Sequence, residues 1–243
     1  MKRKILAFLL GLSGAAMASG AEPVTVAWRD KPPYYYTENG VAKGFLLDRA
    51  RQIFASAGIP ARFVNEPQKR IWTNLKYGVS NYCSISWYRI PEREAIAQYS
   101  LPIHTDQPQG VLVHPSALDR VRSHDNLKAL LADPTLTLGM VDGVSYGMEL
   151  DGMIASSANH IMRRTVETSA MLRMLAVGRA SYIFVDREDW NYLRNKENSL
   201  QSLVLLDYPD MPPGLKRHVV CSRDVPAETM DRLNRAIAAR AGK

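Results

Sequence analysis

The sequence predicts an α/β protein whose chain forms two lobes. Strand-like and helix-like segments alternate from residue 24 to residue 87, and a similar alternation returns from residue 110 to residue 185. Proline-marked segments at 102–108 and 209–213 separate the two stretches and predict two crossings between lobes. Because alternating strands and helices favour a mostly parallel sheet flanked by helices, we expect one such sheet in each lobe. The predicted lobes are residues 22–107 with 208–243, and residues 108–207.

The first stretch shows two different periodicities. Residues 24–28 have the composition of a strand, whereas the apolar residues between Phe45 and Gly58 recur at helical spacing. Gly58 is the last residue of one predicted helix and Gly78 follows another, and glycine is common at such helix ends. The predicted order is strand 24–28, helix 45–58, strand 61–64, helix 70–77 and strand 82–87.

The second stretch repeats this rhythm and ends in a closing helix. Asp125 precedes the helix expected at 126–132 and is a favourable N-cap. Met230, Leu233 and Ile237 lie on one face of a final helix at 226–239. The other predicted elements are strands 110–113, 136–141, 161–166, 181–185 and 218–222, and helices 148–156 and 169–177.

The N-terminus has the pattern of an export signal. Three basic residues at positions 2–4 precede an apolar run, and small residues continue to Ala21. This predicts a secretory signal at residues 1–21, cleaved after Ala18 or Ala21. The alternative is an uncleaved membrane anchor, although the apolar run is shorter than the ~20 residues that a bilayer span needs. We therefore expect a periplasmic protein.

The charge of the chain excludes an extended nucleic-acid interface. The formal net charge is +7, and removing residues 1–21 takes away three bases and no acid, which leaves +4. The remaining bases are scattered along the sequence rather than clustered, so we expect no nucleic-acid partner.

The two cysteines, Cys83 and Cys221, each lie in an apolar, strand-like segment. Export would permit a disulfide between them, but free cysteines are also often buried. We expect two buried free thiols ahead of a disulfide. Neither the cysteines nor the five histidines have the spacing of metal ligands, so we expect no metal and no cofactor.

Short motifs follow one another along nearly the whole predicted mature chain. They are Pro32-Pro33-Tyr34-Tyr35 with Gly44-Phe45-Leu46-Leu47-Asp48, then Leu75 with Gly78, then Pro91-Glu92-Arg93 with Tyr99-Ser100-Leu101-Pro102-Ile103, and then Leu172 with Gly178-Arg179 and Asp186. In this order and at this spacing they resemble family 3 of the bacterial extracellular solute-binding proteins. The resemblance implies the two-lobed periplasmic binding protein fold of type II, with two crossings and a ligand between the lobes.

The resemblance also implies roles for three residues. Arg93 stands where the family's arginine grips a ligand carboxylate, and a planar guanidinium suits that task because it can form two parallel bonds. Asp186 stands where an aspartate pairs with the ligand ammonium, and the rival interpretation is that it caps a helix at 187–194. Ser145 is the third, because it lies at the start of a helix in lobe 2, where backbone N–H groups suit an anionic part of the ligand. A ligand touching both lobes would stabilise their closure.

The sequence departs from the family at several of these positions. Lys31 replaces an aromatic residue that often stacks on the ligand, and Ile90 replaces a threonine. Gln68 replaces a tryptophan and is followed by two cations, Lys69 and Arg70. The predicted site therefore has fewer groups that could bind an ammonium and more cations near the cleft. An acidic ligand fits these residues about as well as an amino acid. The remaining candidate contacts are Tyr34, Ser86, Trp87, Tyr88 and Arg70.

We expect a non-enzymatic, monomeric binding protein that captures an amino acid or related carboxylate for an inner-membrane ABC permease. Two alternatives stay open. One is an exported enzyme on the same fold, such as a dehydratase of a cyclic acid, which would need an acid or base among Glu66, Glu92, Glu149 and Asp186. The other is a free-standing ligand sensor.

Overall fold

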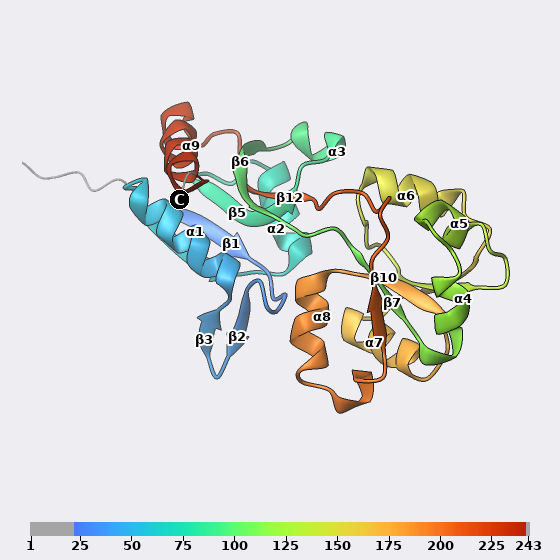
Figure 1. The fold of residues 1–243 in the computed structure, drawn as a ribbon. Helices are drawn as coiled ribbons and strands as arrows, with labels where there is room; N and C mark the ends of the chain where they lie inside the picture. Colours follow the sequence, from blue (N-terminus) through green and yellow to red (C-terminus); the bar gives the residue numbers. More distant parts are fainter. Residues whose placement is uncertain (1–21, 242–243) are drawn as a thin grey trace, which may run out of the picture.

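The computed structural model describes residues 22–241, which fold into two lobes, each built on a five-stranded sheet with helices packed against it (Figure 1). The predicted α/β class is confirmed. The predicted secretory signal lies outside the described residues. Within residues 22–241, no helix combines the length and the apolar character that a membrane crossing would need.

The sheet of lobe 1 draws its strands from both ends of the described chain. The strand order is β4-β1-β5-β12-β6, in which β1 pairs in parallel with β4 and β5, while β12 pairs antiparallel with β5 and β6. The parallel strands therefore end at one common edge of the sheet. The strands are β1 (Val24–Trp28), β4 (Ala61–Asn65), β5 (Tyr82–Tyr88), β6 (Gln98–Thr105) and β12 (Lys216–Cys221).

Helices cover this sheet as the apolar patterns predict. The α1 and α9 helices pack beside each other in Figure 1, and Phe54 and Leu233 belong to one buried cluster with Val26 of β1. A small hairpin projects from this lobe between β1 and α1. The helices are α1 (Phe45–Ser56), α2 (Gln68–Lys76), α3 (Pro91–Glu94) and α9 (Ala227–Ala241), and the hairpin strands are β2 (Tyr36–Glu38) and β3 (Val41–Lys43).

Lobe 2 has the strand order β11-β7-β10-β8-β9, with β10, β8 and β9 parallel and β7 antiparallel to both of its neighbours. Two buried clusters fill its two faces. The strands are β7 (Gly110–Val113), β8 (Thr137–Val141), β9 (His160–Arg164), β10 (Tyr182–Val185) and β11 (Val204–Leu206). The helices are η1 (Pro115–Ala117), α4 (Leu118–Arg122), α5 (Leu127–Leu131), α6 (Met148–Ala155), α7 (Thr168–Ala176), α8 (Arg187–Arg194) and η2 (Asn198–Leu200).

Two connections join the sheets, at residues 106–109 and 207–215. They run side by side where the amide of Asp106 donates to the carbonyl of Leu215 at 2.9 Å. A Cβ on Gly214 would lie 1.7 Å from the backbone oxygen of Asp106, so only glycine allows this approach. The two crossings are thereby held together between the lobes.

Two local expectations need correction, and one local element was not predicted. Pro102 lies inside β6 rather than starting the first crossing, because an edge strand tolerates a residue without an N–H donor. The predicted cap Asp125 is one residue early: the side chain of Asn126 accepts from the amide of Ala129 and begins α5. The hairpin of β2 and β3 lies between the predicted strand 24–28 and helix 45–58 and was not among the predicted elements, since its strands are only three residues long.

The expectation of free thiols is wrong, because Cys83 and Cys221 form a disulfide. The two residues face each other in the register of β5 and β12, which are neighbouring antiparallel strands. The sequence could not reveal this because the bonded residues are 138 positions apart. The disulfide ties the first half of lobe 1 to the strand that returns from lobe 2.

Candidate functional site at the lobe boundary

A buried arginine, Arg217, organises the contact between the lobes. It lies on β12, its side chain is only 3% exposed, and all three of its nitrogens are engaged. Its Nε donates to Asp106 at 2.7 Å, and its Nη1 donates to Ser86 at 3.3 Å. Its Nη2 donates to the hydroxyl of Tyr88 at 2.7 Å and to Asp186 at 3.3 Å. Because Asp186 follows β10 of lobe 2, this bond crosses from one lobe to the other.

Asp186 has every acceptor position of its carboxylate in use. Its Oδ1 accepts from the amides of Glu188 and Asp189, so it caps α8. Its Oδ2 accepts from the Tyr34 hydroxyl at 2.6 Å and from Arg217. A carboxylate offers about four lone-pair sites, and four donors already occupy them here.

A second ion pair joins the lobes beside the first. The ammonium of Lys31, from the segment after β1, donates to Asp189 of α8 at 2.6 Å. The same ammonium lies 4.3 Å from the centre of the Tyr34 ring, and the Arg217 guanidinium lies 4.2 Å from it. The lobes therefore contact each other directly through the protein's own charges.

Burial and pairing shift the pKa values of these groups in opposite directions. Burial raises the pKa of Tyr34 and of Tyr88 well above the ordinary phenol value, so both keep their protons as donors. Burial opposes the ionised form of Asp186, but Lys31, the Tyr34 hydroxyl and Arg217 outweigh it, and the pKa of Asp186 lies below its usual value. Burial likewise opposes the charge on Arg217, but its partners hold that pKa above normal.

A bulge in β5 aims the side chains that meet Arg217. The pairing of β12 with β5 passes from Trp87 to Ile85 and skips Ser86. Ser86 has φ of 70°, a left-handed conformation that non-glycine residues seldom adopt. Bulges of this kind redirect neighbouring side chains, and here Ser86 and Tyr88 both contact Arg217. We call Arg217, Tyr34, Ser86, Tyr88, Asp106 and Asp186 the Arg217 group.

Arg93 lies in a different environment at the same edge of lobe 1. Its guanidinium stacks 4.5 Å from the ring centre of Trp72 and 5.4 Å from that of Trp87. Arg29, directly after β1, stacks 5.1 Å from the same Trp87 ring. The two indoles meet edge to face at 4.8 Å. We call Arg29, Arg93, Trp72 and Trp87 the Arg93 group.

The structure brings most, but not all, of the residues expected at the site together. Tyr34, Ser86, Tyr88 and Asp186 belong to the Arg217 group, and Trp87 and Arg93 to the Arg93 group. Ser145 donates to Asp151 at 2.5 Å and accepts from the amide of Gly147, at the start of α6. Arg70 is exposed on α2. Within residues 22–241, neither Ser145 nor Arg70 forms a hydrogen bond with the other expected residues.

Sequence reasoning missed Arg217, Asp106, Asp189 and Arg29. One signal was visible for Arg217, which stands two residues before the apolar run Val219-Val220-Cys221. An arginine that is buried beside such a run needs a partner for its charge. Its acceptors lie more than 30 positions away in every case, so the sequence could not identify them. Lys31 was noted only as a missing aromatic residue, whereas it forms an ion pair.

The acids considered for catalysis are placed as follows. Glu66 accepts from Tyr82 at 2.8 Å and from Asn74 at 3.2 Å. Glu92 and Glu149 are exposed, and Asp186 is fully bonded. Among the described residues, no group of three or more histidines, cysteines and acids could hold a metal ion.

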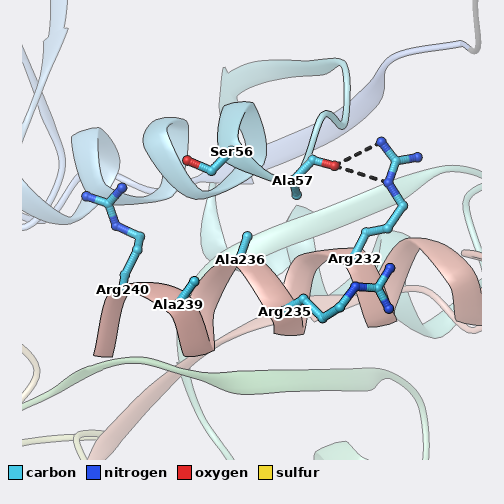
Figure 2. Close-up of a pocket in the computed structure, with 7 residues that line it drawn as sticks. All are labelled: Ser56, Ala57, Arg232, Arg235, Ala236, Ala239 and Arg240. Atoms are coloured by element: carbon cyan, nitrogen blue, oxygen red, sulfur yellow. Dashed lines mark hydrogen bonds between the residues drawn. The ribbon is translucent and has the colours of Figure 1, made fainter. Parts of the chain in front are cut away.

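A pocket of about 770 Å³ lies on the outer surface of lobe 1, away from these groups. It runs between α1 and α9, and Figure 2 shows Arg232, Arg235 and Arg240 along it. Arg232 donates to the carbonyl of Ala57 at the end of α1, and Arg240 donates to Gln52. Two of these arginines thus join the two helices.

Family and structural relatives agree with the architecture. Residues 24–239 match the family described as bacterial extracellular solute-binding proteins, family 3, and the chain belongs to that family. It is therefore a protein of the ligand-binding class that the two-lobed fold defines. No curated protein matches the chain.

Several solved structures share the fold at low identity. The arginine-, lysine-, histidine-binding protein ArtJ of Geobacillus stearothermophilus is 18% identical with a TM-score of 0.66, covering 91% of this chain and 90% of its own. A structure from work on glutathione import through GshT and the cystine ABC importer TcyBC of Streptococcus mutans is 14% identical, with a TM-score of 0.67 and the same coverage. The ancestral amino acid-binding protein AncCDT-1, a precursor of cyclohexadienyl dehydratase, is 17% identical with a TM-score of 0.66 and the same coverage.

Proposed function

We propose that this protein captures a small carboxylate-bearing solute between its lobes and holds the carboxylate on Arg93. The observation that carries the proposal is the state of that guanidinium. It is stacked on two indoles, yet it forms no hydrogen bond with any residue in the range 22–241. The Arg217 guanidinium, by contrast, has every nitrogen engaged.

The position of Arg93 also favours this role. Arg93 follows β5, and Arg29 follows β1, at the edge where the parallel strands of lobe 1 end. Ligands of open α/β sheets bind outside that edge. Lys31, two residues after Arg29, reaches lobe 2, so this edge faces the second lobe. A ligand on Arg93 would be enclosed when the lobes close.

The cellular setting follows from the family rather than from the site. We propose export to the periplasm through the basic and apolar signal at residues 1–21, and delivery of the solute to an ABC permease as a monomer. The family of extracellular solute-binding proteins supports this, as does the fold shared with a structure from the study of a cystine ABC importer. We propose no catalytic step, because the acids expected near the site are either bonded within the protein or exposed on its surface.

Binding to the Arg93→Ala variant tests the proposal. The mature chain would be screened by thermal shift against amino acids, monocarboxylates and dicarboxylates, and any hit measured by calorimetry. A ligand at about 100 times its Kd stabilises the folded state by about 2.7 kcal/mol, which gives a clear shift. Arg93→Ala should abolish binding. The matched control is Arg89→Ala, because Arg89 lies four residues earlier and pairs with Glu94. Undiminished affinity in Arg93→Ala would refute the assignment.

A further inference from the structure

Two cations share one aromatic ring in the Arg93 group without an acid to neutralise them. The Arg29 and Arg93 guanidinium carbons lie 5.1 and 5.4 Å from the centre of the Trp87 ring. Arg29 donates to the neutral side chain of Gln68, and within residues 22–241 no carboxylate forms a salt bridge with either arginine. Burial lowers the pKa of Arg93, and the nearby charge of Arg29 acts in the same direction.

Buried hydrogen-bond donors without partners gather at the same place. The Nε of Arg29 and the Nε1 of Trp72 are both inaccessible to solvent and have no acceptor among the described residues. An unsatisfied buried donor costs about 1–3 kcal/mol. Both groups can only donate, so the ligand that relieves them must bring acceptor oxygens.

The start of α2 adds to this positive region. Gln68, the acceptor for Arg29, is the first residue of α2, and no side chain caps that end of the helix. The first turn holds no acid but carries Lys69 and Arg70. Cations at a helix N-terminus oppose the helix dipole, whereas an anion there is favoured.

The acids at the lobe boundary are already paired with cations of the protein. The four acceptor sites of Asp186 are filled by two amides, Tyr34 and Arg217. Asp189 binds Lys31, and Asp106 accepts from both Arg217 and Tyr88. Arg217 and Lys31 thus supply within the protein the positive charge that an amino acid would bring.

We infer that the ligand is a small dicarboxylic acid without an ammonium group, one carboxylate on Arg93 and the other on Arg29, with Trp72 as a further donor. This rests on the proposed function, since it places the ligand on the same face. Arg29 is the residue that makes the site prefer a ligand with a second carboxylate. Arg217 excludes zwitterions, because it occupies the carboxylate that would bind their ammonium.

A set of matched acids tests this inference on the mature chain. Glutarate carries two carboxylates on a three-carbon spacer, 4-aminobutyrate replaces one of them by an ammonium, butyrate has only one, and L-glutamate adds an ammonium to glutarate. Malonate, succinate and adipate vary the spacing. Titration calorimetry should show that a dicarboxylate binds at least about tenfold more tightly than its monocarboxylate or zwitterionic counterparts, a difference typical of one charge-assisted contact.

Variants then assign the two carboxylates. Arg93→Gln should abolish binding of every acid, whereas Arg29→Gln should weaken the dicarboxylate at least about tenfold and leave the monocarboxylate unchanged, because it removes one ion pair. Trp72→Phe keeps an aromatic ring but removes the N–H, and should weaken the dicarboxylate about threefold or more, as expected for one hydrogen bond. Arg51→Gln is the control, since Arg51 is a partly exposed cation stacked on Phe63 away from the lobe boundary.

The outcomes separate this inference from the proposed function. If an amino acid binds most tightly and needs Arg93 but not Arg29, the proposed function stands and the inference is overturned. If no dicarboxylate of the series binds, the inference is likewise overturned. Loss of all binding in Arg29→Gln together with equal affinity for glutarate and butyrate would also overturn it. Dicarboxylate binding that is weakened by both Arg93→Gln and Arg29→Gln supports both.

Discussion

The two arginine groups at the lobe boundary differ in how their charges are compensated. In the Arg217 group, a nearly inaccessible guanidinium has acids and hydroxyls at every nitrogen. In the Arg93 group, two guanidinium groups lie against one indole, and neither forms a salt bridge with any acid of residues 22–241. Both groups include residues at the end of β5, namely Ser86 and Tyr88 in the first and Trp87 in the second.

The Arg217 group is therefore a contact within the protein, whereas the Arg93 group has donors left to receive a ligand and is the receptive group. A buried charge is tolerated only when it is paired, and the Arg217 group meets that condition with residues of both lobes. The Arg93 group leaves donors without acceptors, as expected where an external acceptor completes the set. Fold membership alone would have treated both as parts of one ligand site.

The largest expected change in the free energy of unfolding comes from removing Arg217 from the Arg217 group. Arg217→Met leaves Asp106 and Asp186 buried without their cation and should lower the free energy of unfolding by about 3–5 kcal/mol. Urea denaturation followed by circular dichroism measures it. Combining Arg217→Met with Asp106→Asn and Asp186→Asn should recover part of the loss, because the stranded charges are gone. A loss below about 1 kcal/mol, the range of exposed ion pairs, would show that the group is not paired in solution.

The disulfide joins two strands that carry members of both groups, and its removal gives the next prediction. It joins β5, which carries Trp87 and Tyr88, to β12, which carries Arg217. Cys83→Ala with Cys221→Ala should lower the free energy of unfolding by about 2–5 kcal/mol, since the bond closes a long loop. Ligand preference should stay unchanged. Denaturation with and without a reductant checks the first point, and a changed order of affinities among the matched acids would contradict the second.

The fold could be predicted from the sequence because its signals are local. Apolar periodicity placed α1 and β5 within two residues of their observed bounds. The helix proposed at 187–194 coincides with α8 and is capped by Asp186. Where a pattern broke, as at Pro102 in β6, the error came from reading a tolerated edge residue as an element boundary.

Site residues could be proposed from the sequence only where a short motif marks a single residue. Arg93 was predicted from its motif, and within residues 22–241 its guanidinium forms no salt bridge; its contact with a ligand stays a prediction. The partners of Arg217 depend on the register of β12 against β5 and β6 and on the approach of lobe 2, which no local pattern encodes. Asp186 was interpreted as a ligand contact or a helix cap, and the structure shows the cap; contact with a ligand stays a prediction.

Lowering the pH should reduce the stability that the Arg217 group contributes before it affects the Arg93 group. The pKa of Asp186 lies below its usual value because Lys31, Tyr34 and Arg217 outweigh its burial. Its stabilising contribution is therefore complete above the unfolded pKa of about 3.9 and is lost as the pH falls through the lower folded value. Urea midpoints between pH 2.5 and pH 6 should fall more steeply below pH 4 in the parent than in Asp186→Asn. If the urea midpoints of the parent and of Asp186→Asn fell in parallel with pH, these partners would not stabilise the ionised form of Asp186.

The smallest expected effect on stability comes from removing a cation of the receptive group. Arg93→Ala loses two stacking contacts, worth about 0.5–1 kcal/mol at exposed sites, but it also relieves the repulsion from Arg29. The net change in the free energy of unfolding should stay below about 1 kcal/mol, even though the variant no longer binds an acid. Urea denaturation without ligand, with Arg89→Ala as the matched surface control, measures it. A loss as large as that of Arg217→Met would mean that Arg93 supports the fold, and the contrast between a paired and a receptive group would fail.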